Sequence, residues 1–262
     1  MKSSKKLGTT ELLFSCAQKM SLNPTWLIAN NTFVFTVQKE EYYINLARSP
    51  LNSEASAAYA KNKYLTRIIL DRHHIQNIPY FMTSNLKEAV TFLATHGKIV
   101  AKPVKGAGAR DIHIISKVSE FDNLDISNYI LEKYIEGTEL RYLLLNNEII
   151  AVHRSEYGDS VASDRPLKRI SLEKAQWEER LSDTAKSVSE VLQLHFAAVD
   201  FMIDESGFAY VLEVNTMPGL KWFHSPTSGP VVDVAGKFLE SILKMAPTDT
   251  PLLPPLTPQF AH

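Results

Sequence analysis

The sequence predicts an α+β fold built on antiparallel sheets, and two observations support this prediction. Apolar stretches of strand length are joined by short turns, as at Asn30-Asn31 and Asn146-Asn147, which is typical of β-hairpins. Segments with helical periodicity fall between these hairpins at irregular intervals, whereas a doubly wound parallel sheet would alternate strands and helices regularly.

The first half of the chain shows these patterns in order. Helical periodicity begins at Thr9 and continues to Met20, and a second helical run spans 53–74. The dipeptide Ile78-Pro79 ends that run in an extended turn, and Gly97 closes the next helix. The strands expected here cover 26–29, 33–37, 42–46, 99–103 and 112–115, and the third helix covers 86–96.

The second half contains the longer hairpins. A strand at 129–132 precedes a hairpin over 140–154, and two further strands at 197–203 and 209–214 flank a turn at 204–207. Long helices are expected at 172–192 and 231–244. Prolines gather after residue 246, which indicates an extended arm.

Composition excludes several classes of protein. The chain has 262 residues, 45% hydrophobic and 22% charged, with a net charge of -1, which argues against a chain-wide surface for nucleic acid or a membrane. Apolar runs fall short of the ~18 residues that span a bilayer, and we identify no signal peptide. The single cysteine, Cys16, excludes a disulfide framework and a cysteine-based zinc site, and predicts a reducing, cytoplasmic location.

The strands around the 204–207 turn carry a candidate metal site. Asp200 interrupts an otherwise apolar strand, and Glu213 and Asn215 lie two apart on the next strand, so they share one face. Two carboxylates and an amide oxygen are donors suited to Mg²⁺, which usually completes its coordination with water and phosphate oxygens. Taken singly, each is more easily read as an ordinary polar residue at a strand end.

A lysine at the end of an apolar strand is a candidate phosphate ligand. Lys102 follows a buried strand, Lys63 lies upstream, and the loop containing Gly106 and Gly108 could bring backbone N–H groups to a phosphate. The loop matches neither the Walker A pattern nor the dinucleotide fingerprint. A solvated surface lysine is the competing interpretation.

The segment 131–139 has the chemistry of an adenine site. An apolar strand runs into a Glu-Lys-aromatic-aliphatic turn, whose backbone can bind a base edge while a later carboxylate accepts ribose hydroxyls. From chemistry alone, a charged loop is the simpler interpretation.

Together these segments resemble the ATP-grasp carboxylate–amine ligases over roughly residues 53–243. The stretch 210–220 is similar to the family's E-x-N-x-x-P-G strand, and Asn62-Lys63-Tyr64-Leu65-Thr66 is similar to its D-K-x-x-T helix. The motifs look most like the ATP-grasp module of cyanophycin synthetase and the glutathione synthetase module of bifunctional glutathione-making enzymes, and more distantly like D-alanine–D-alanine ligase.

The resemblance implies a domain division and a set of roles. A short N-terminal lobe (1–52) would precede two subdomains that clasp ATP (53–130 and 131–246) and a Pro-rich tail (247–262). One or two Mg²⁺ ions, or Mn²⁺ as an alternative, would be the metal cofactor. The implied ATP ligands are Lys63, Lys102, Gly106, Gly108, Glu132, Lys133, Tyr134, Ile135 and Glu139; the metal ligands are Asp200, Glu213 and Asn215; the catalytic arginines are Arg141 and Arg154, on a hairpin expected to reach the transferred phosphoryl group; and the substrate residues are His224 and Ser225.

The implied reaction joins a small carboxylate to an amine through an acyl phosphate, with release of ADP and phosphate. The carboxylate is expected to be an amino acid or a short peptide, and the sequence leaves a homodimer open. Ala109 and Asp111 replace glycines of the family's phosphate loop, so a catalytically reduced nucleotide-binding regulatory or scaffold module is the alternative. A phosphotransferase of another fold is disfavoured, because no kinase-type glycine loop occurs.

Overall fold

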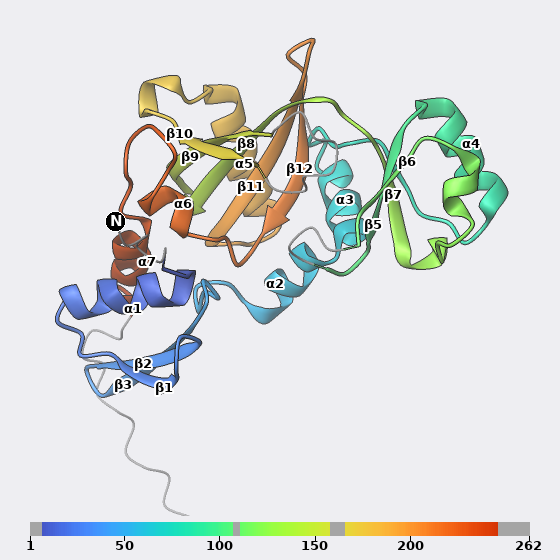
Figure 1. Ribbon diagram of the computed structural model, residues 1–262. Coiled ribbons are helices and arrows are strands. Elements are labelled where there is room, and N and C mark those ends of the chain that lie inside the picture. Colours follow the sequence, from blue (N-terminus) through green and yellow to red (C-terminus); the bar gives the residue numbers. More distant parts are fainter. Residues whose placement is uncertain (1–6, 107–110, 158–165, 246–262) are drawn as a thin grey trace, which may run out of the picture.

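The computed structural model describes residues 7–106, 111–157 and 166–245, and it confirms an α+β fold. Its strands form sheets of three, five and four strands, in which paired neighbours run antiparallel. The five-stranded sheet is central, with the three-stranded sheet at one end and the four-stranded sheet at the other (Figure 1). No helix in these described ranges is long and apolar enough to cross a membrane.

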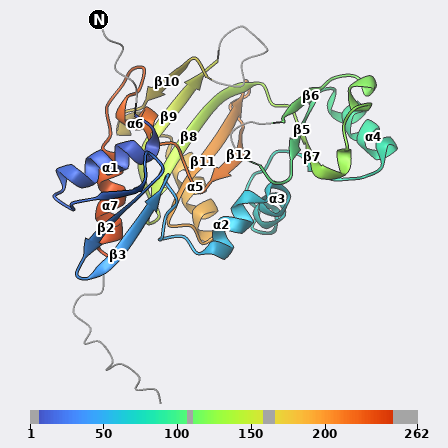
Figure 2. The ribbon, with the colours of Figure 1, turned by 60° about the horizontal axis from the view of Figure 1, so that its bottom comes forward.

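The N-terminal segment is a helix packed on a small meander. Phe33 and Phe35 alternate with more exposed residues, so their rings face α1, and Leu13 of that helix is fully buried against them. The same apolar cluster includes Phe196 and Leu239, so this segment shares its core with the central sheet and with α7 (Figure 2). Its elements are α1 (Thr9–Lys19), β1 (Thr25–Ile28), β2 (Thr32–Val37) and β3 (Glu40–Asn45).

The helical run predicted over 53–74 is two helices, α2 (Glu54–Lys61) and α3 (Lys63–Arg72). The break falls at Asn62, whose backbone is extended and whose side chain accepts a hydrogen bond from the Leu65 N–H, so it caps α3. The Lys63 N–H donates to the Val104 carbonyl. This tertiary contact explains why a continuous helical pattern is interrupted. α3 lies between the two larger sheets in both views (Figures 1 and 2).

The four-stranded sheet has the order β4-β7-β5-β6 and is packed against α4. The predicted domain boundary between residues 130 and 131 falls inside β7. A boundary after Lys133, where this strand ends, would keep the four-stranded sheet whole. The elements of this region are β4 (Tyr80–Phe81), α4 (Leu86–His96), β5 (Ile99–Pro103), β6 (His113–Ile115), the short 3-10 helices Val118–Phe121 and Ile126–Asn128, and β7 (Tyr129–Lys133).

The five-stranded sheet has the order β10-β9-β8-β11-β12. The predicted hairpins are confirmed, with Asn146 and Asn147 both at positive φ in the turn. Strand β10 and helix α6 were not predicted, and the proline-rich tail lies outside the described residues. The elements are β8 (Gly137–Leu145), β9 (Glu148–Glu156), β10 (Lys168–Ser171), a 3-10 helix (Lys174–Gln176), α5 (Glu179–Val191, shorter than the predicted 172–192), β11 (Phe196–Asp204), β12 (Ala209–Asn215), α6 (Lys221–His224) and α7 (Val234–Leu243).

Candidate active site between the two larger sheets

A cavity of about 260 Å³ lies between the four-stranded and the five-stranded sheet. Each sheet contributes charged side chains to it, and aliphatic side chains from both form its walls. The end of β7 and the segment after it close one side, where Lys133, Tyr134 and Ile135 lie. The charged lining residues are Lys63, Lys102, Glu132, Lys133, Glu139 and Glu213, and the apolar ones include Ile78, Val100, Ile112, Ile114, Ile135, Met202 and Leu212.

Lys102 and Glu132 form a buried ion pair in this cavity. Their closest N···O distance is 2.7 Å, and Arg67 binds the other oxygen of Glu132 through Nε at 2.8 Å and Nη2 at 2.7 Å. Burial alone would raise the pKa of Glu132, but Arg67 and Lys102 outweigh it and lower that pKa to about 2. The Glu132 side chain, predicted as part of an adenine hinge, is therefore engaged by two cations.

Lys63 reaches the same cavity from the start of α3. Its ammonium donates to the Gly106 carbonyl at 3.0 Å. Burial lowers the pKa of Lys63, while Glu213 opposes that shift. The structure thus brings together the two predicted phosphate lysines, Lys63 and Lys102, with Gly106 beside them. Gly108 lies outside the described residues.

The predicted metal residues meet across β11 and β12. Asp200 pairs with Glu213 in the strand register and with Arg141 on the other side. Arg141 donates to both oxygens of Asp200, at 2.6 and 2.7 Å, and the amide nitrogen of Asn215 donates to Asp200 Oδ2 at 3.0 Å. Asp200 is therefore held by its neighbours, which orients the side-chain oxygens of this cluster.

Glu213 is the least compensated carboxylate of this cluster. Burial, and then the charge of Asp200, raise the pKa of Glu213. No Lys, Arg or His nitrogen among the described residues comes within ion-pair distance of it. A buried carboxylate in this state favours a cation, and the Glu213, Asp200 and Asn215 oxygens suit Mg²⁺. In the described ranges, no three His, Cys, Asp or Glu side chains form a metal-binding group.

Glu139, the predicted ribose ligand, lines the cavity from β8. It is buried, and it accepts hydrogen bonds from Ser155 Oγ at 3.0 Å and from the Tyr157 hydroxyl. Tyr157, which no sequence motif singled out, also lines the cavity.

Arg154 does not reach this site, contrary to the prediction. It pairs with Leu140, whose side chain packs in the core with α5, whereas Arg141 pairs with His153 on the opposite face. The Arg154 side chain is 44% exposed, and its Nη2 donates to Glu156 at 3.2 Å. Arg154 therefore lies on the wrong face of the sheet for phosphoryl transfer.

Arg169 on β10 is the arginine that sequence reasoning missed. It pairs with Ser155, which pairs with Glu139, so Arg169 shares the site face. Its Nε and Nη1 are buried without a hydrogen-bond partner in the described structure, and burial followed by the charge of Arg141 lowers its pKa. The short strand Lys168–Ser171 has too little pattern to have revealed it.

His224 and Ser225, the predicted substrate residues, are not among the lining residues of the cavity. The His224 Nε2 accepts a hydrogen bond from the Ala235 N–H at 3.0 Å, so the ring caps the start of α7. Ser225 is exposed at the end of α6. The His224 ring thus helps to hold the start of α7.

Asp111 turns away from the cavity. Its carboxylate binds the His113 ring at 2.7 Å and the Tyr129 hydroxyl, while Ile112 and Ile114 of the same segment face the cavity. The negative charge expected beside a triphosphate is therefore directed elsewhere. Ala109 lies outside the described residues.

Comparison with known proteins identifies relatives of this chain. A family model described as "ATP-grasp domain" matches residues 60–219. The chain is 26% identical to a tetrahydromethanopterin:alpha-L-glutamate ligase of Methanocaldococcus jannaschii, covering 81% of this chain and 75% of that protein. It is 24% identical to a D-alanine--D-alanine ligase of Clostridium beijerinckii, covering 63% of this chain and 60% of that protein.

Solved structures share the fold at low identity. A bifunctional glutathione synthetase from Pasteurella multocida superposes with a TM-score of 0.66 at 15% identity, covering 90% of this chain and 44% of that one. The ATP-grasp ligase PsnB, solved with a minimal precursor, Mg and ADP, gives a TM-score of 0.61 at 17% identity over 74% of this chain and 61% of that one. This chain therefore spans between about two fifths and three fifths of the length of these two structural neighbours.

Proposed function

Because the chain belongs to the ATP-grasp family, we propose that it is an ATP-dependent ligase that joins a carboxylate to an amine through an acyl phosphate. The family match and the ligase names of the relatives support an enzyme of this class. We further propose that a substrate is an amino acid or a short peptide, since the names of these relatives include L-glutamate and D-alanine.

The convergence of Lys63, Lys102 and Glu213 in one cavity carries this proposal. Two ammonium groups and a buried carboxylate come from different elements of the fold, yet all line the same space. Aliphatic walls beside them fit a purine ring, while the lysines would neutralise phosphate charge. Such a mixture of apolar walls and convergent charge is typical of a nucleotide site.

The residues around Glu213 fit a magnesium ion. Glu213 and Asp200 would hold it, Asn215 would contribute its amide oxygen, and the nucleotide phosphates would complete its coordination. The ion would supply charge neutralisation at the phosphoryl group. Arg141, anchored by Asp200, and Arg169, with unpaired buried donors, would hold the developing charge of the acyl phosphate from the protein side.

A second cavity gives the carboxylate a route to this centre. It measures about 500 Å³, lies between α2 and the chain that follows β12, and shares Lys63, Gly106 and Glu213 with the nucleotide cavity. A substrate there would face the transferred phosphoryl group across Glu213. Its carboxylate oxygen would attack the γ-phosphorus, ADP would leave, and an amine would then displace phosphate from the acyl carbon.

The alternative of a catalytically reduced nucleotide-binding module rested on Ala109 and Asp111. Asp111 binds His113 and Tyr129 instead of facing the cavity. Lys63, Lys102 and Glu213 all line that cavity. These contacts favour an active ligase over a scaffold.

The deciding experiment supplies ATP, Mg²⁺ and pairs of amino acids, and measures ADP, phosphate and product mass. Replacing the amine with hydroxylamine should trap the activated acyl group as a hydroxamate, and Glu213→Gln should abolish both products with the fold retained, because the metal loses a charged ligand. Formation of AMP and pyrophosphate, or of a phosphorylated product that hydroxylamine never intercepts, would overturn the ligase assignment.

A further inference from the structure

We propose that Arg67 is a positioning residue for ATP binding, which acts on the phosphates through Glu132 and Lys102 and couples them to the strand that carries Glu213. This inference rests on the proposed function, because it takes Lys102 as a phosphate ligand. None of the sequence motifs singled out Arg67, which lies in the second turn of α3.

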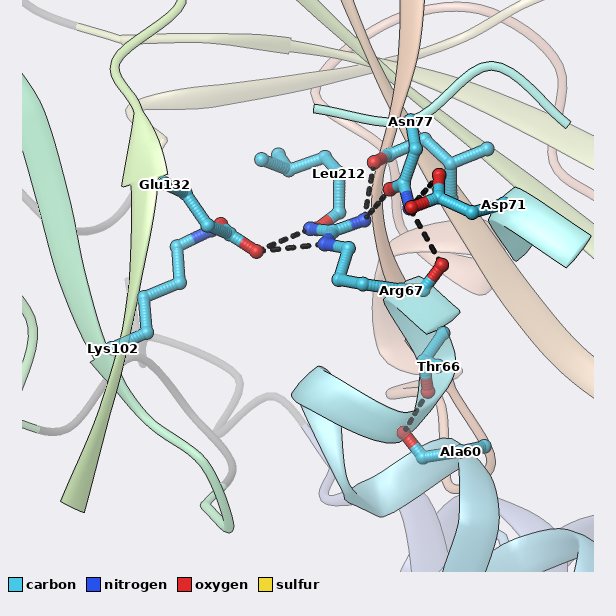
Figure 3. Close-up of polar contacts among 9 residues, drawn as sticks. Ala60, Thr66, Arg67, Asp71, Asn77, Lys102, Glu132 and Leu212 are labelled. Atoms are coloured by element: carbon cyan, nitrogen blue, oxygen red, sulfur yellow. Dashed lines mark hydrogen bonds and ion pairs between the residues drawn. The ribbon is translucent and has the colours of Figure 1, made fainter. Parts of the chain in front are cut away.

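The guanidinium of Arg67 joins the two larger sheets. On one side it contacts Glu132 of β7 in the four-stranded sheet (Figure 3). On the other, Nη1 donates to the Val211 carbonyl and Nη2 to the Leu212 carbonyl of β12 in the five-stranded sheet, both at 2.7 Å. Leu212 immediately precedes Glu213. One buried side chain, 3% exposed, thus connects the pair Glu132–Lys102 to the proposed metal strand.

The Asn77 side chain holds the guanidinium in place. The Asn77 side-chain oxygen accepts from Arg67 Nη1 at 2.7 Å, and its amide nitrogen donates to the Arg67 carbonyl at 3.0 Å and to Asp71 at 3.3 Å. Residues 76 and 77 also pair with Val211 along the free edge of β12. Only an arginine presents a planar fork of donors in several directions at once, and a lysine could satisfy only part of this set.

The charges explain how Arg67 reaches the nucleotide. Glu132 is shared by two cations, so the trio of Arg67, Glu132 and Lys102 retains one net positive charge at the cavity wall. Without the Arg67 charge, Lys102 and Glu132 would form a neutral pair, and the ammonium would be less able to attract phosphate. Arg67 thus orients Lys102 through Glu132 and leaves the positive charge of Lys102 able to attract phosphate. Arg67 itself is not among the residues that line the cavity.

Calorimetric titration of the purified full chain with two probes tests this role. A non-hydrolysable ATP analogue reports on the phosphates, and adenosine reports on the base pocket alone. Arg67→Lys should weaken the analogue about tenfold, roughly 1.4 kcal/mol, because a lysine cannot bind Glu132 and the β12 carbonyls together, so that Glu132 pairs more completely with Lys102. Adenosine affinity should stay within about twofold of the wild type. Arg72→Lys, on the exposed end of the same helix, is the matched control and should change neither affinity.

A double-mutant cycle tests the route through Lys102. In a Lys102→Ala background, Arg67→Lys should cause little further loss of analogue affinity, since the side chain it acts through is gone. Additive losses, or an equal loss of analogue and adenosine, would overturn the positioning role. Should Arg67→Lys fail to fold, Asn77→Ala removes one acceptor of the guanidinium and keeps its charge, and it should show the same selectivity for the analogue.

The outcomes separate this inference from the proposed function. A wild-type protein that binds neither probe overturns the nucleotide site and this inference with it. A wild-type protein that binds the analogue, with Arg67→Lys binding it equally well, overturns the positioning role alone.

Discussion

Arg154 and Arg169 lie on adjacent strands but on opposite faces of the sheet. A regular two-residue hairpin at Asn146-Asn147 would set Arg154 opposite Glu139, on the site face. The β8–β9 register shifts between Leu143 and Leu144, so that Glu139 instead pairs with Ser155. One extra residue in a strand reverses the face of every side chain beyond it. This bulge therefore places Arg154 on the face opposite Glu139, while Arg169 lies on the same face as Glu139.

At the residue scale, we expect Arg169→Ala to lower turnover about a hundredfold, because it removes the buried, unpartnered donors that we propose hold the acyl phosphate. Arg154→Ala is the matched comparison and should change turnover little, since that side chain faces solvent. The rate of hydroxamate formation at saturating ATP measures both. A loss for Arg154→Ala as large as for Arg169→Ala would contradict the assignment of faces.

At the element scale, the pairing of β8 with β11 sets the geometry of the site. This ladder aligns Arg141 with Asp200 and Glu139 with Met202 along the cavity. It begins at Gly137, where a Cβ atom would lie 1.9 Å from the Ile203 carbonyl oxygen. Backbone cannot move aside as a flexible side chain can, so glycine is required at this close approach.

Gly137→Ala should therefore destabilise the protein by about 3 kcal/mol, since the extra methyl group forces the two strands apart. Gly219→Ala is the control, because a Cβ there meets no atom within 4 Å. Urea unfolding followed by circular dichroism measures both changes. Equal midpoints for the two variants would show that the β8–β11 approach is looser than the structure indicates.

At the scale of the whole molecule, the buried network of Arg67, Glu132 and Lys102 makes stability depend on pH. The pKa of Glu132 is about 2 in the folded protein, below the ordinary value of 4.5. Between these values the unfolded chain binds a proton that the folded protein does not, so stability rises with pH. The contribution of Glu132 is complete above its ordinary pKa and is lost as the pH falls toward about 2.

The wild type should therefore lose more stability than Glu132→Gln when the pH is lowered from 5 through this range, because the variant has no carboxyl to protonate. The urea midpoints of both proteins, measured across this pH range, give the difference in their stability. The contributions of the other carboxyl groups are common to both proteins and cancel in that difference. Parallel curves would mean that the pKa of Glu132 is the same in the folded and the unfolded protein.

Local sequence patterns were sufficient for the elements and for part of the site. Alternation along β12 placed Glu213 and Asn215 on one face, because strand periodicity is a local property. Asp200 joins that face only through the register shift between Asp200 and Phe201, which pairs Asp200 with Glu213. Gly97 and the Asn146-Asn147 turn likewise end their elements where positive φ is required. The family match over residues 60–219 confirms the resemblance. That resemblance predicted Lys63 and Lys102 as phosphate ligands, and both line the same cavity.

Local patterns therefore predicted most of the secondary structure, the family and the residues whose spacing is local. Packing between distant segments settled which arginine lies on the face of Glu139, how α3 and its Arg67 join two sheets, and that His224 caps α7. These outcomes depend on a bulge in one hairpin and on contacts between residues far apart in the chain, such as Arg67 with Leu212. Periodicity contains no information about such contacts, because they are set by how whole elements pack.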